Sequence, residues 1–338
     1  MIEQYYDISQ VPYKRESRER ILTGFPELDY YTKGLSVGIT LLVANTNVGK
    51  STLVQNILAR AIEQGYKSWV FSGEHTADSF LQLLYHQNST KKDYIAIPYR
   101  DCHGERTNIV DWYVTEEKEE ELKSKFAGNI FIYSNKARRD IDTIIESMVS
   151  CRKEQGARFF IIDNMISIDN ISSNVYAEQT MITEKIRMFA LNYKCIVLLV
   201  AHQRKSSNRD GFLLDIQDVA GSQNISNKAY NVIAQYRSDM LPKESGDYEY
   251  LKKCMAKCGF DIEKCDGVLH VLKTKGNGCG FVGITYDRDT LTYRQSTKIS
   301  KTEADRVLNS KQIRIEEIAM SDDTNPFDSD VSDTGIPF

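Results

Sequence analysis

The sequence predicts an α/β fold: a mostly parallel sheet with helices on both faces and an antiparallel C-terminal strand extension. Between residues 24 and 203, short apolar runs alternate with segments whose apolar residues recur at helical spacing. Apolar runs of this kind are typical of parallel strands that are buried on both faces. After residue 230 the apolar runs follow one another without helical segments between them. This change of pattern favours antiparallel pairing at the end of the sheet.

Each element has its own local signal, an apolar run for a strand or helical apolar spacing closed by a polar residue or glycine for a helix. The expected strands are 38–44, 67–74, 129–134, 158–164, 195–203, 231–237, 267–275, 281–287 and 291–295. The expected helices are 51–65, 77–87, 140–156, 176–194 and 301–318, with a short helix before residue 231. Residues 88–128 are polar and charged, and we expect loop and helix there.

Composition places the chain among globular proteins that work inside the cell. The 338 residues are 41% hydrophobic and 27% charged, which is ordinary for a globular protein. No apolar run approaches the ~20 residues of a membrane-spanning helix, and the first ten residues lack the layout of a secretory signal. We therefore expect a cytoplasmic protein with no membrane partner. The net charge is −4, but the last 18 residues contain five Asp and no Lys or Arg, so the charge of the rest does not decide for or against nucleic acid.

Residues 44–51, Ala-Asn-Thr-Asn-Val-Gly-Lys-Ser, have the spacing of a phosphate-binding loop, except that alanine replaces the first glycine. They lie between an expected buried strand and an expected helix, which is the context that this motif requires. Backbone N–H groups and a helix N-terminus would then face phosphate, and Ala44 is tolerated if its φ stays negative. The residues expected to bind ATP and Mg²⁺ are Asn47, Val48, Gly49, Lys50, Ser51 and Thr52, with Lys50 at the phosphates and Ser51 on the metal.

Three polar residues follow the ends of other expected strands. Asp163 closes an apolar strand, where a second Mg²⁺-side carboxylate would lie; the alternative is a helix cap. Glu74 would orient and polarise the attacking water, unless it is only a surface residue at a strand end. His202 would touch the γ-phosphate, although a lone histidine is usually structural.

With these residues in place, the chain resembles the ATPase domain of replicative hexameric DNA helicases of the DnaB, Twinkle and phage gene-4 type, within the RecA-like superfamily. The stretch GFPELDYYTKGLSVGITLLVANTNVGKST, then Glu74, Asp163, AHQRK and VLKTKGNG follow in the order of that family, over roughly residues 18–294. The resemblance implies a RecA-like P-loop ATPase domain at 21–296, preceded by an arm at 1–20. A C-terminal helix at 297–318 and a disordered acidic tail at 319–338 would follow.

The resemblance also implies roles for individual residues. Lys50 and Ser51 would bind phosphate and Mg²⁺, Glu74 would be the catalytic base, Asp163 the Mg²⁺-side carboxylate, and His202 the sensor that links the γ-phosphate to the DNA loops. Residues 204–219 fall where the family has a DNA-contacting loop. The candidate DNA contacts there are Arg204, Lys205 and Arg209, and the alternative is a solvated charged loop.

In this family ATP lies between the subunits of a ring, usually a hexamer, and a neighbouring subunit supplies a basic finger. The matching residues here are Lys273 and Lys275, without the usual arginine. Lysine offers a point charge rather than a planar fork, which puts the rate of hydrolysis in question. Arg237 and Arg288 lie nearby in sequence and stay open as alternatives.

Residues 238–267 exceed the short connection usual in the family and carry Cys254, Cys258 and Cys265. Free thiols are favoured over a zinc site there, because the spacing is not that of a standard zinc motif.

The end of the chain resembles the C-terminal tip of bacterial single-stranded DNA-binding proteins, in which acidic residues precede a terminal phenylalanine. The corresponding residues are Asp330, Asp333, Ile336, Pro337 and Phe338. The partners this implies are host proteins that bind that tip, or a primase.

The leading hypothesis is an ATP-dependent replicative helicase that moves on single-stranded DNA as a ring, encoded by a phage or mobile element in a bacterial host cell. One alternative is a RecA-like DNA-dependent ATPase that does not unwind, such as a recombination mediator or helicase loader. Another is a non-catalytic ATP-binding protein that recruits partners. DNA-stimulated turnover and strand separation distinguish the three.

Overall fold

The computed structural model describes residues 19–100, 106–169, 175–202, 213–214, 216 and 223–309. Nine strands form one sheet in the order β11-β10-β9-β8-β1-β7-β6-β2-β5. They are β1 (Gly38–Ala44), β2 (Ser68–Ser72), β5 (Ile130–Ile132), β6 (Phe159–Asp163), β7 (Ile196–His202), β8 (Asn231–Arg237), β9 (Gly267–Lys273), β10 (Gly280–Asp287) and β11 (Thr292–Gln295). The six strands from β8 to β5 in this order are parallel, and β9, β10 and β11 are antiparallel. The predicted fold class is confirmed, with the extension beginning at β9.

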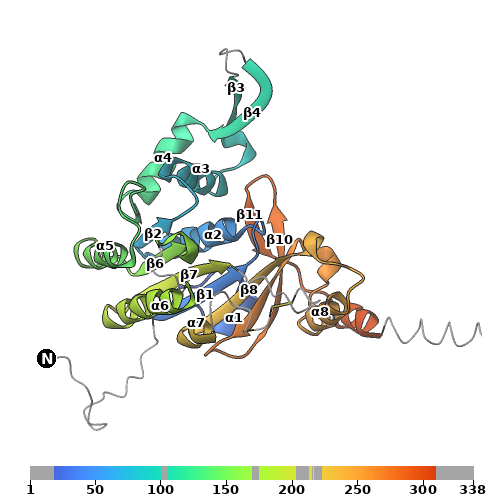
Figure 1. The fold of residues 1–338 in the computed structure, drawn as a ribbon. Helices are drawn as coiled ribbons and strands as arrows, with labels where there is room; N and C mark the ends of the chain where they lie inside the picture. Colours follow the sequence, from blue (N-terminus) through green and yellow to red (C-terminus); the bar gives the residue numbers. More distant parts are fainter. Residues whose placement is uncertain are drawn as a thin grey trace, which may run out of the picture.

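Helices cover both faces of this sheet (Figure 1). The helices of the structure include α1 (Pro26–Thr32), α2 (Lys50–Glu63), α3 (Ala77–Gln87), α4 (Glu116–Phe126), α5 (Ile141–Glu154), α6 (Val175–Asn192), α7 (Gln223–Lys228) and α8 (Gly246–Lys257). The helix α2 packs against β2, β6 and β11, while α6 packs against β1 and β7. Figure 1 shows α2 on one side of the sheet and α6 with α7 on the other. The central strands β1 and β6 are buried along their whole length, which explains their unbroken apolar sequences.

Residues 88–128 differ from the expectation of loop and helix. They contain α4, as expected, but also a hairpin of β3 (Tyr94–Arg100) and β4 (Arg106–Val114), which pair outside the main sheet. Figure 1 shows this hairpin projecting from the body. Its base is anchored by tertiary contacts, since the Tyr94 hydroxyl donates to the carbonyls of His86 and Asp289. Asp289 is 195 residues from Tyr94 in sequence, so local composition did not reveal this anchor of the hairpin.

The ends of the chain are only partly described. Residues 301–309 are helical, and the rest of the expected helix at 301–318 lies outside the described residues, as do the tail and most of the N-terminal arm. Among the residues that the structure describes, no helix is long and apolar enough to cross a membrane.

Candidate functional site

The phosphate-binding loop joins β1 to α2 at the carboxyl edge of the parallel strands. Asn47 and Gly49 have left-handed backbone conformations, with φ of 62° and 84°, and Val48 lies between them with a negative φ. This alternation points successive N–H groups to one side and forms a concave anion site. Lys50 is the first residue of α2, so the positive end of that helix faces the same space. Ala44 ends β1 with a negative φ, which meets the condition set for it in the sequence.

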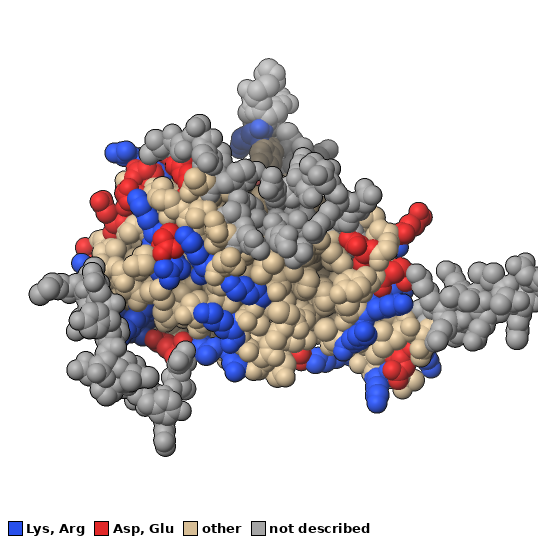
Figure 2. All heavy atoms as spheres, turned by 60° about the horizontal axis from the view of Figure 1, so that its bottom comes forward, with Lys and Arg blue, Asp and Glu red and all other residues tan. Residues whose placement is uncertain are grey.

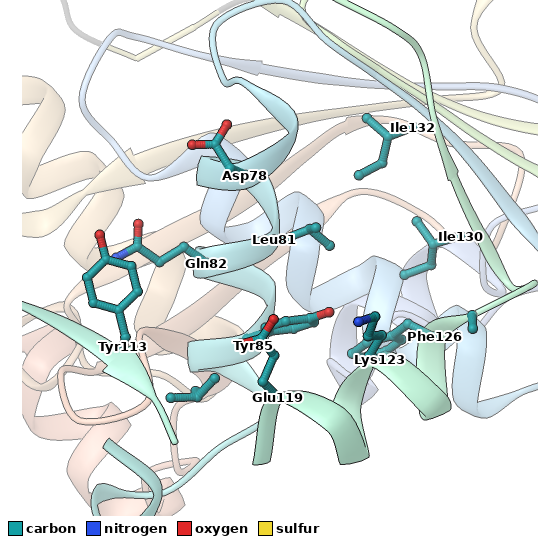
Figure 3. Close-up of a pocket in the computed structure, with 12 residues that line it drawn as sticks. Asp78, Leu81, Gln82, Tyr85, Tyr113, Glu119, Lys123, Phe126, Ile130 and Ile132 are labelled. Atoms are coloured by element: carbon teal, nitrogen blue, oxygen red, sulfur yellow. The ribbon is translucent and has the colours of Figure 1, made fainter. Parts of the chain in front are cut away.

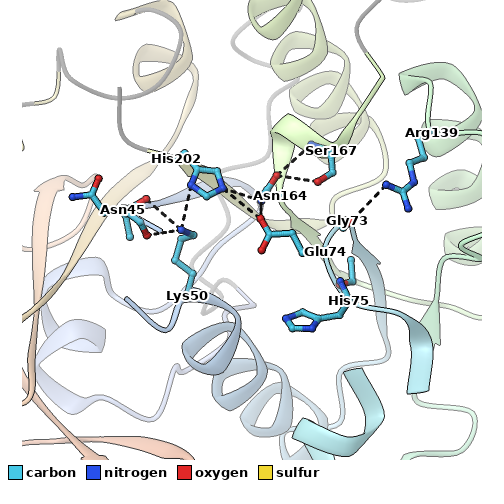
Figure 4. Close-up of polar contacts among 11 residues, drawn as sticks. Asn45, Lys50, Gly73, Glu74, His75, Arg139, Asn164, Ser167 and His202 are labelled. Carbon is cyan, nitrogen blue, oxygen red and sulfur yellow. Dashed lines mark hydrogen bonds and ion pairs between the residues drawn. The ribbon is translucent and has the colours of Figure 1, made fainter. Parts of the chain in front are cut away.

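Lys50 is folded into the carboxyl edge of the sheet. Its Nζ donates to the carbonyl of Asn45 at 2.6 Å and lies 3.3 Å from His202 Nδ1 (Figure 4). Burial lowers the pKa of Lys50, and the carboxylates of Asp163 and Glu74 oppose that shift. The ammonium group is therefore poorly solvated and gains from an anion that enters the site.

Glu74, Asn164 and His202 meet at the ends of three neighbouring strands, β2, β6 and β7 (Figure 4). The Asn164 side chain donates from Nδ2 to Glu74 Oε1 at 2.6 Å and lies 3.0 Å from His202 Nε2. The Glu74 side chain is 56% exposed, so its carboxylate is open to water and substrate. Burial lowers the pKa of His202, and the charge of Lys50 lowers it further. The imidazole is therefore neutral at neutral pH.

Asp163 and Ser51 form the oxygen pair that the sequence assigned to a metal. The Ser51 hydroxyl donates a hydrogen bond to the Asp163 carboxyl, and burial raises the pKa of Asp163. The Asp163 side chain is buried beside Lys50, at the C-terminal end of β6. A hydroxyl and a carboxylate side by side fit Mg²⁺, which takes few protein oxygens and completes its shell with water and phosphate.

Sequence analysis did not single out Asn164 or Gly73. Asn164 follows Asp163 at the same strand end, and its Oδ1 accepts from the N–H and hydroxyl of Ser167. A Cβ on Gly73 would lie 2.1 Å from the Ser167 side chain, so only glycine fits there. The available signal was position alone: both residues adjoin the carboxyl ends of strands that carry expected site residues.

A cleft of about 640 Å³ lies on the other side of the phosphate-binding loop from Glu74. The loop contributes Asn47, Gly49 and Thr52 to its lining. The C-terminal strands and the turn between them contribute Tyr286, Arg288, Leu291 and Tyr293. Residues of the segment 238–267 form the remaining wall. The segment 238–267 therefore lies beside the phosphate-binding loop and shares this cleft with it.

The same segment contains α8 and two short 3₁₀ turns, which the sequence did not predict. Cys254, Cys258, Cys265 and Cys279 are free thiols. No cluster of three potential metal ligands among His, Cys, Asp and Glu occurs in the described part of the chain.

Lys273 and Lys275 lie at the opposite edge of the sheet. Lys273 pairs with Val232 at the start of β8, whereas the loop contacts Gln235 and Arg237 at the end of β8, about 10 to 17 Å away along the strand. The Lys273 ammonium donates to the carbonyls of Ser226 and Asn227, and Lys275 Nζ lies 4.0 Å above the ring of Tyr230. Neither lysine can reach the phosphate-binding loop of its own subunit.

Arg237 and Arg288 lie on the loop's side of the sheet instead. The Arg237 guanidinium donates to the carbonyl of Asn47 at 3.2 Å and pairs with Asp239. Arg288 lines the cleft. Both therefore lie beside the phosphate-binding loop of the same chain.

The remaining expected residues cannot be placed. Arg204, Lys205 and Arg209, and the tail residues Asp330, Asp333, Ile336, Pro337 and Phe338, lie outside the described residues. Figure 2 shows one face of the molecule, on which Lys and Arg are mixed with Asp and Glu. The coloured part of that face carries no uninterrupted basic strip.

A second hollow, of about 530 Å³, lies at the β5 edge between α3 and α4 (Figure 3). Its lining is mainly apolar and aromatic, with Tyr85 of α3 stacked on Phe126 of α4. None of the expected site residues lines it. The chemistry is therefore concentrated at the carboxyl edge.

Comparison with known proteins agrees with this arrangement. A solved structure that is described as an ATPase domain has a TM-score of 0.62 at 16% identity, over 82% of this chain and 92% of that chain. Another, named "The Structure Of A DnaB-Like Replicative Helicase And Its Interactions With Primase", has a TM-score of 0.62 at 15% identity, over 83% of this chain and 64% of that chain. Identity this low shows a shared fold. No protein among the curated ones matches.

The DnaB-like helicase C terminal domain family matches residues 20–295, which is most of the chain. The protein belongs to that family and is an ATP-hydrolysing helicase.

Proposed function

We propose that this protein is a ring-forming motor that translocates on single-stranded DNA and hydrolyses ATP with Mg²⁺ at the carboxyl edge of its sheet. The observation that carries the proposal is the convergence of six side chains at that edge. Lys50 lies against His202, Asn164 joins Glu74 to His202, and Ser51 bonds to Asp163. A chance Gly-Lys-Ser turn would not be surrounded in this way.

Each residue has a chemical task in this proposal. The loop N–H groups and Lys50 bind the β- and γ-phosphates and neutralise the charge that develops on them. Ser51 and Asp163 would hold Mg²⁺, which when bound would act as a Lewis acid on the phosphates. Glu74, oriented by Asn164, positions the attacking water and accepts its proton. His202 is neutral and lies against Lys50 and Asn164, so it would respond to the γ-phosphate.

The cleft beside the loop would receive the ribose and base. Gly49 and Thr52 line it on the side of the loop, and Tyr286 and Arg288 line it as well. Phosphates over Lys50 would direct the nucleoside away from Glu74 and toward this cleft. An aromatic ring and a guanidinium group both stack well on a base.

A neighbouring subunit would complete the site. Lys273 and Lys275 lie at the opposite edge from their own loop, and burial together with the charge of Lys275 lowers the pKa of Lys273. A head-to-tail ring, for which we propose six subunits, brings one subunit's lysines to the next subunit's nucleotide. The loop at 204–219, with Arg204, Lys205 and Arg209, follows His202 directly and would contact DNA inside the ring.

The remaining proposals concern context. We place the protein in the cytoplasm of a bacterial host, encoded by a phage or mobile element. The acidic tail at 319–338 would recruit a primase or host proteins that bind the tip of single-stranded DNA-binding proteins. The arm at 1–20 would pack on a neighbouring subunit.

The decisive experiment compares ATP hydrolysis by the wild type and Glu74→Gln, with and without single-stranded DNA. We expect DNA to stimulate the wild type, and Glu74→Gln to lower turnover on the order of 10²- to 10⁴-fold while ATP still binds. Glu146→Gln is the matched control, because Glu146 is an exposed residue of α5 and should behave as wild type. Equal turnover by all three proteins would contradict the role of Glu74.

Unwinding separates the helicase from the alternatives. On a forked duplex, the wild type should separate the strands only with ATP and Mg²⁺. DNA-stimulated hydrolysis without strand separation would instead favour a recombination mediator or helicase loader.

A further inference from the structure

The phosphate-binding loop makes contacts that the catalytic roles above do not use. The carbonyl of Val48 accepts two hydrogen bonds, from Gln235 Nε2 at 3.0 Å and from the Tyr293 hydroxyl at 3.1 Å. The carbonyl of Asn47 accepts one from Arg237 Nη1 at 3.2 Å. The donors come from β8 and β11, which are far from the loop in sequence and lie on the side away from Glu74.

These hydrogen bonds are made to the part of the loop whose backbone conformation is most restricted. Asn47 and Gly49 are left-handed, so the peptides on either side of Val48 must hold one orientation for their N–H groups to face phosphate. A peptide that rotates would turn its carbonyl oxygen, with its partial negative charge, toward the anion. Two donors on the Val48 carbonyl and one on the Asn47 carbonyl oppose that rotation.

The donors are themselves fixed. Gln235 is 1% exposed and pairs with Ala44 in the sheet, beside the start of the loop. Tyr293 is 9% exposed, and its backbone N–H donates to Asn56 Oδ1 of α2 at 2.8 Å. Burial raises the pKa of Tyr293 to about 12, so its hydroxyl keeps its proton and remains a donor. A Cβ on Gly49 would lie 2.4 Å from that hydroxyl, which shows how closely the ring packs on the loop.

We propose that Tyr293 and Gln235, with Arg237, are positioning residues that hold the Asn47 and Val48 carbonyls away from the nucleotide and keep the loop N–H groups directed at its phosphates. The proposal rests on nucleotide binding at this loop. It gives the antiparallel extension a part in the subunit's own ATP site, in addition to carrying the lysines at the opposite edge.

The test is nucleotide binding by the full chain, measured by calorimetry with ADP and, separately, with inorganic tripolyphosphate. Tyr293→Phe keeps the ring and removes the hydroxyl, and Gln235→Met keeps the side-chain length and removes the donor. Each single variant should weaken both ligands about three- to tenfold, as expected for one lost hydrogen bond. The double variant leaves the Val48 carbonyl without these donors, and should weaken both ligands by about 10²-fold or more. In turnover, KM for ATP should rise while kcat stays near the wild-type value.

Tyr133→Phe is the matched control. Tyr133 is also a buried tyrosine whose hydroxyl donates to a backbone carbonyl, that of Arg138, but it lies on the β5 side of the sheet. We expect it to lower thermal stability about as much as Tyr293→Phe and to bind both ligands as the wild type does. The comparison separates loss of stability from loss of positioning.

Three results would overturn the inference. Wild-type affinity in Tyr293→Phe, with the thermal shift of Tyr133→Phe, would make the hydroxyl merely structural. Weaker ADP binding with unchanged tripolyphosphate binding would assign the hydroxyl to the nucleoside instead. A wild type that binds neither ADP nor ATP would overturn the proposed function itself, which the first two results leave intact.

Discussion

The two edges of the main sheet, at the carboxyl and the amino ends of its parallel strands, carry different chemical groups. The carboxyl edge of the parallel strands carries the loop, the hydrogen-bonded hydroxyl and carboxyl groups of Ser51 and Asp163, and a carboxylate open to water, but its cation Lys50 is already folded against backbone carbonyls and His202. The opposite edge carries Lys273 and Lys275, where burial and the charge of Lys275 lower the pKa of Lys273. The described residues at that edge include no phosphate-binding loop.

The difference supports the proposal that one subunit holds the two halves of a site at opposite ends of the same strands. Because β8 and β9 are antiparallel neighbours, their pairing fixes the distance between the halves. A single copy cannot bring them together without dismantling the sheet. A second copy of the chain can bring the two halves together.

Removing the cation of the first edge should have the strongest consequence. Lys50→Ala removes the positive charge of the ammonium group that would bind the phosphates. This change should lower ATP turnover on the order of 10³-fold. Lys153→Ala, an exposed lysine on α5, is the control and should leave turnover unchanged. Steady-state phosphate release measures both. Substantial activity in Lys50→Ala would show that the loop is not the hydrolytic site.

The lysines at the opposite edge should affect hydrolysis only at the site of a neighbouring subunit. Lys275→Ala should lower DNA-stimulated turnover on the order of 10²-fold, less than an arginine finger is worth, because lysine offers a single point charge. Mixing Lys275→Ala with Glu74→Gln should restore part of the activity, since some interfaces then combine an intact Glu74 with an intact Lys275. Lys273→Ala can be tested in the same way. Mixtures that stay as inactive as their components would argue against a shared site.

His270 of β9 should make the stability of the protein depend on pH. His270 of β9 is largely buried against Phe281, and burial lowers its pKa from 6.5 to about 4. The unfolded chain therefore takes up this proton at a higher pH than the folded one. The resulting stability is full above about pH 6.5 and is lost as pH falls toward 4, by about 2 kcal/mol between pH 7 and pH 5.

Urea denaturation at pH 7 and pH 5 measures that loss. His270→Leu should reduce the difference between the two pH values by about the same 2 kcal/mol. An unchanged difference in the variant would assign the acid sensitivity to other groups.

The mildest consequence should come from the unusual first residue of the loop. Ala44 has a negative φ within a buried strand, so Ala44→Gly relieves no strain. We expect KM for ATP to change less than about twofold and stability to fall by about 0.5–1 kcal/mol, from the added freedom of glycine in the unfolded chain. A large gain in turnover would mean that the alanine restrains the loop.

Much of this arrangement could be predicted from the sequence because its signals are local. Apolar runs defined the strands of the main sheet, and the order of strand, loop and helix identified the phosphate-binding loop. Asp163, Glu74 and His202 were expected at one edge because each closes such a run, and parallel strands bring their carboxyl ends together. The structure places the three side chains at that edge.

The residues that sequence reasoning missed all depend on contacts between distant segments. The hairpin of β3 and β4 is held by Tyr94, whose partners include Asp289, and Asn164 has a role only because β2 and β7 flank β6. The loop donors Gln235 and Tyr293 are 187 and 245 residues from Val48 in sequence. Local sequence was therefore enough to identify the strands of the main sheet and the loop expected to bind phosphate. It could not reveal which side chains orient that loop or contact one another across the strands, because sheet order and register, rather than local pattern, bring those side chains together.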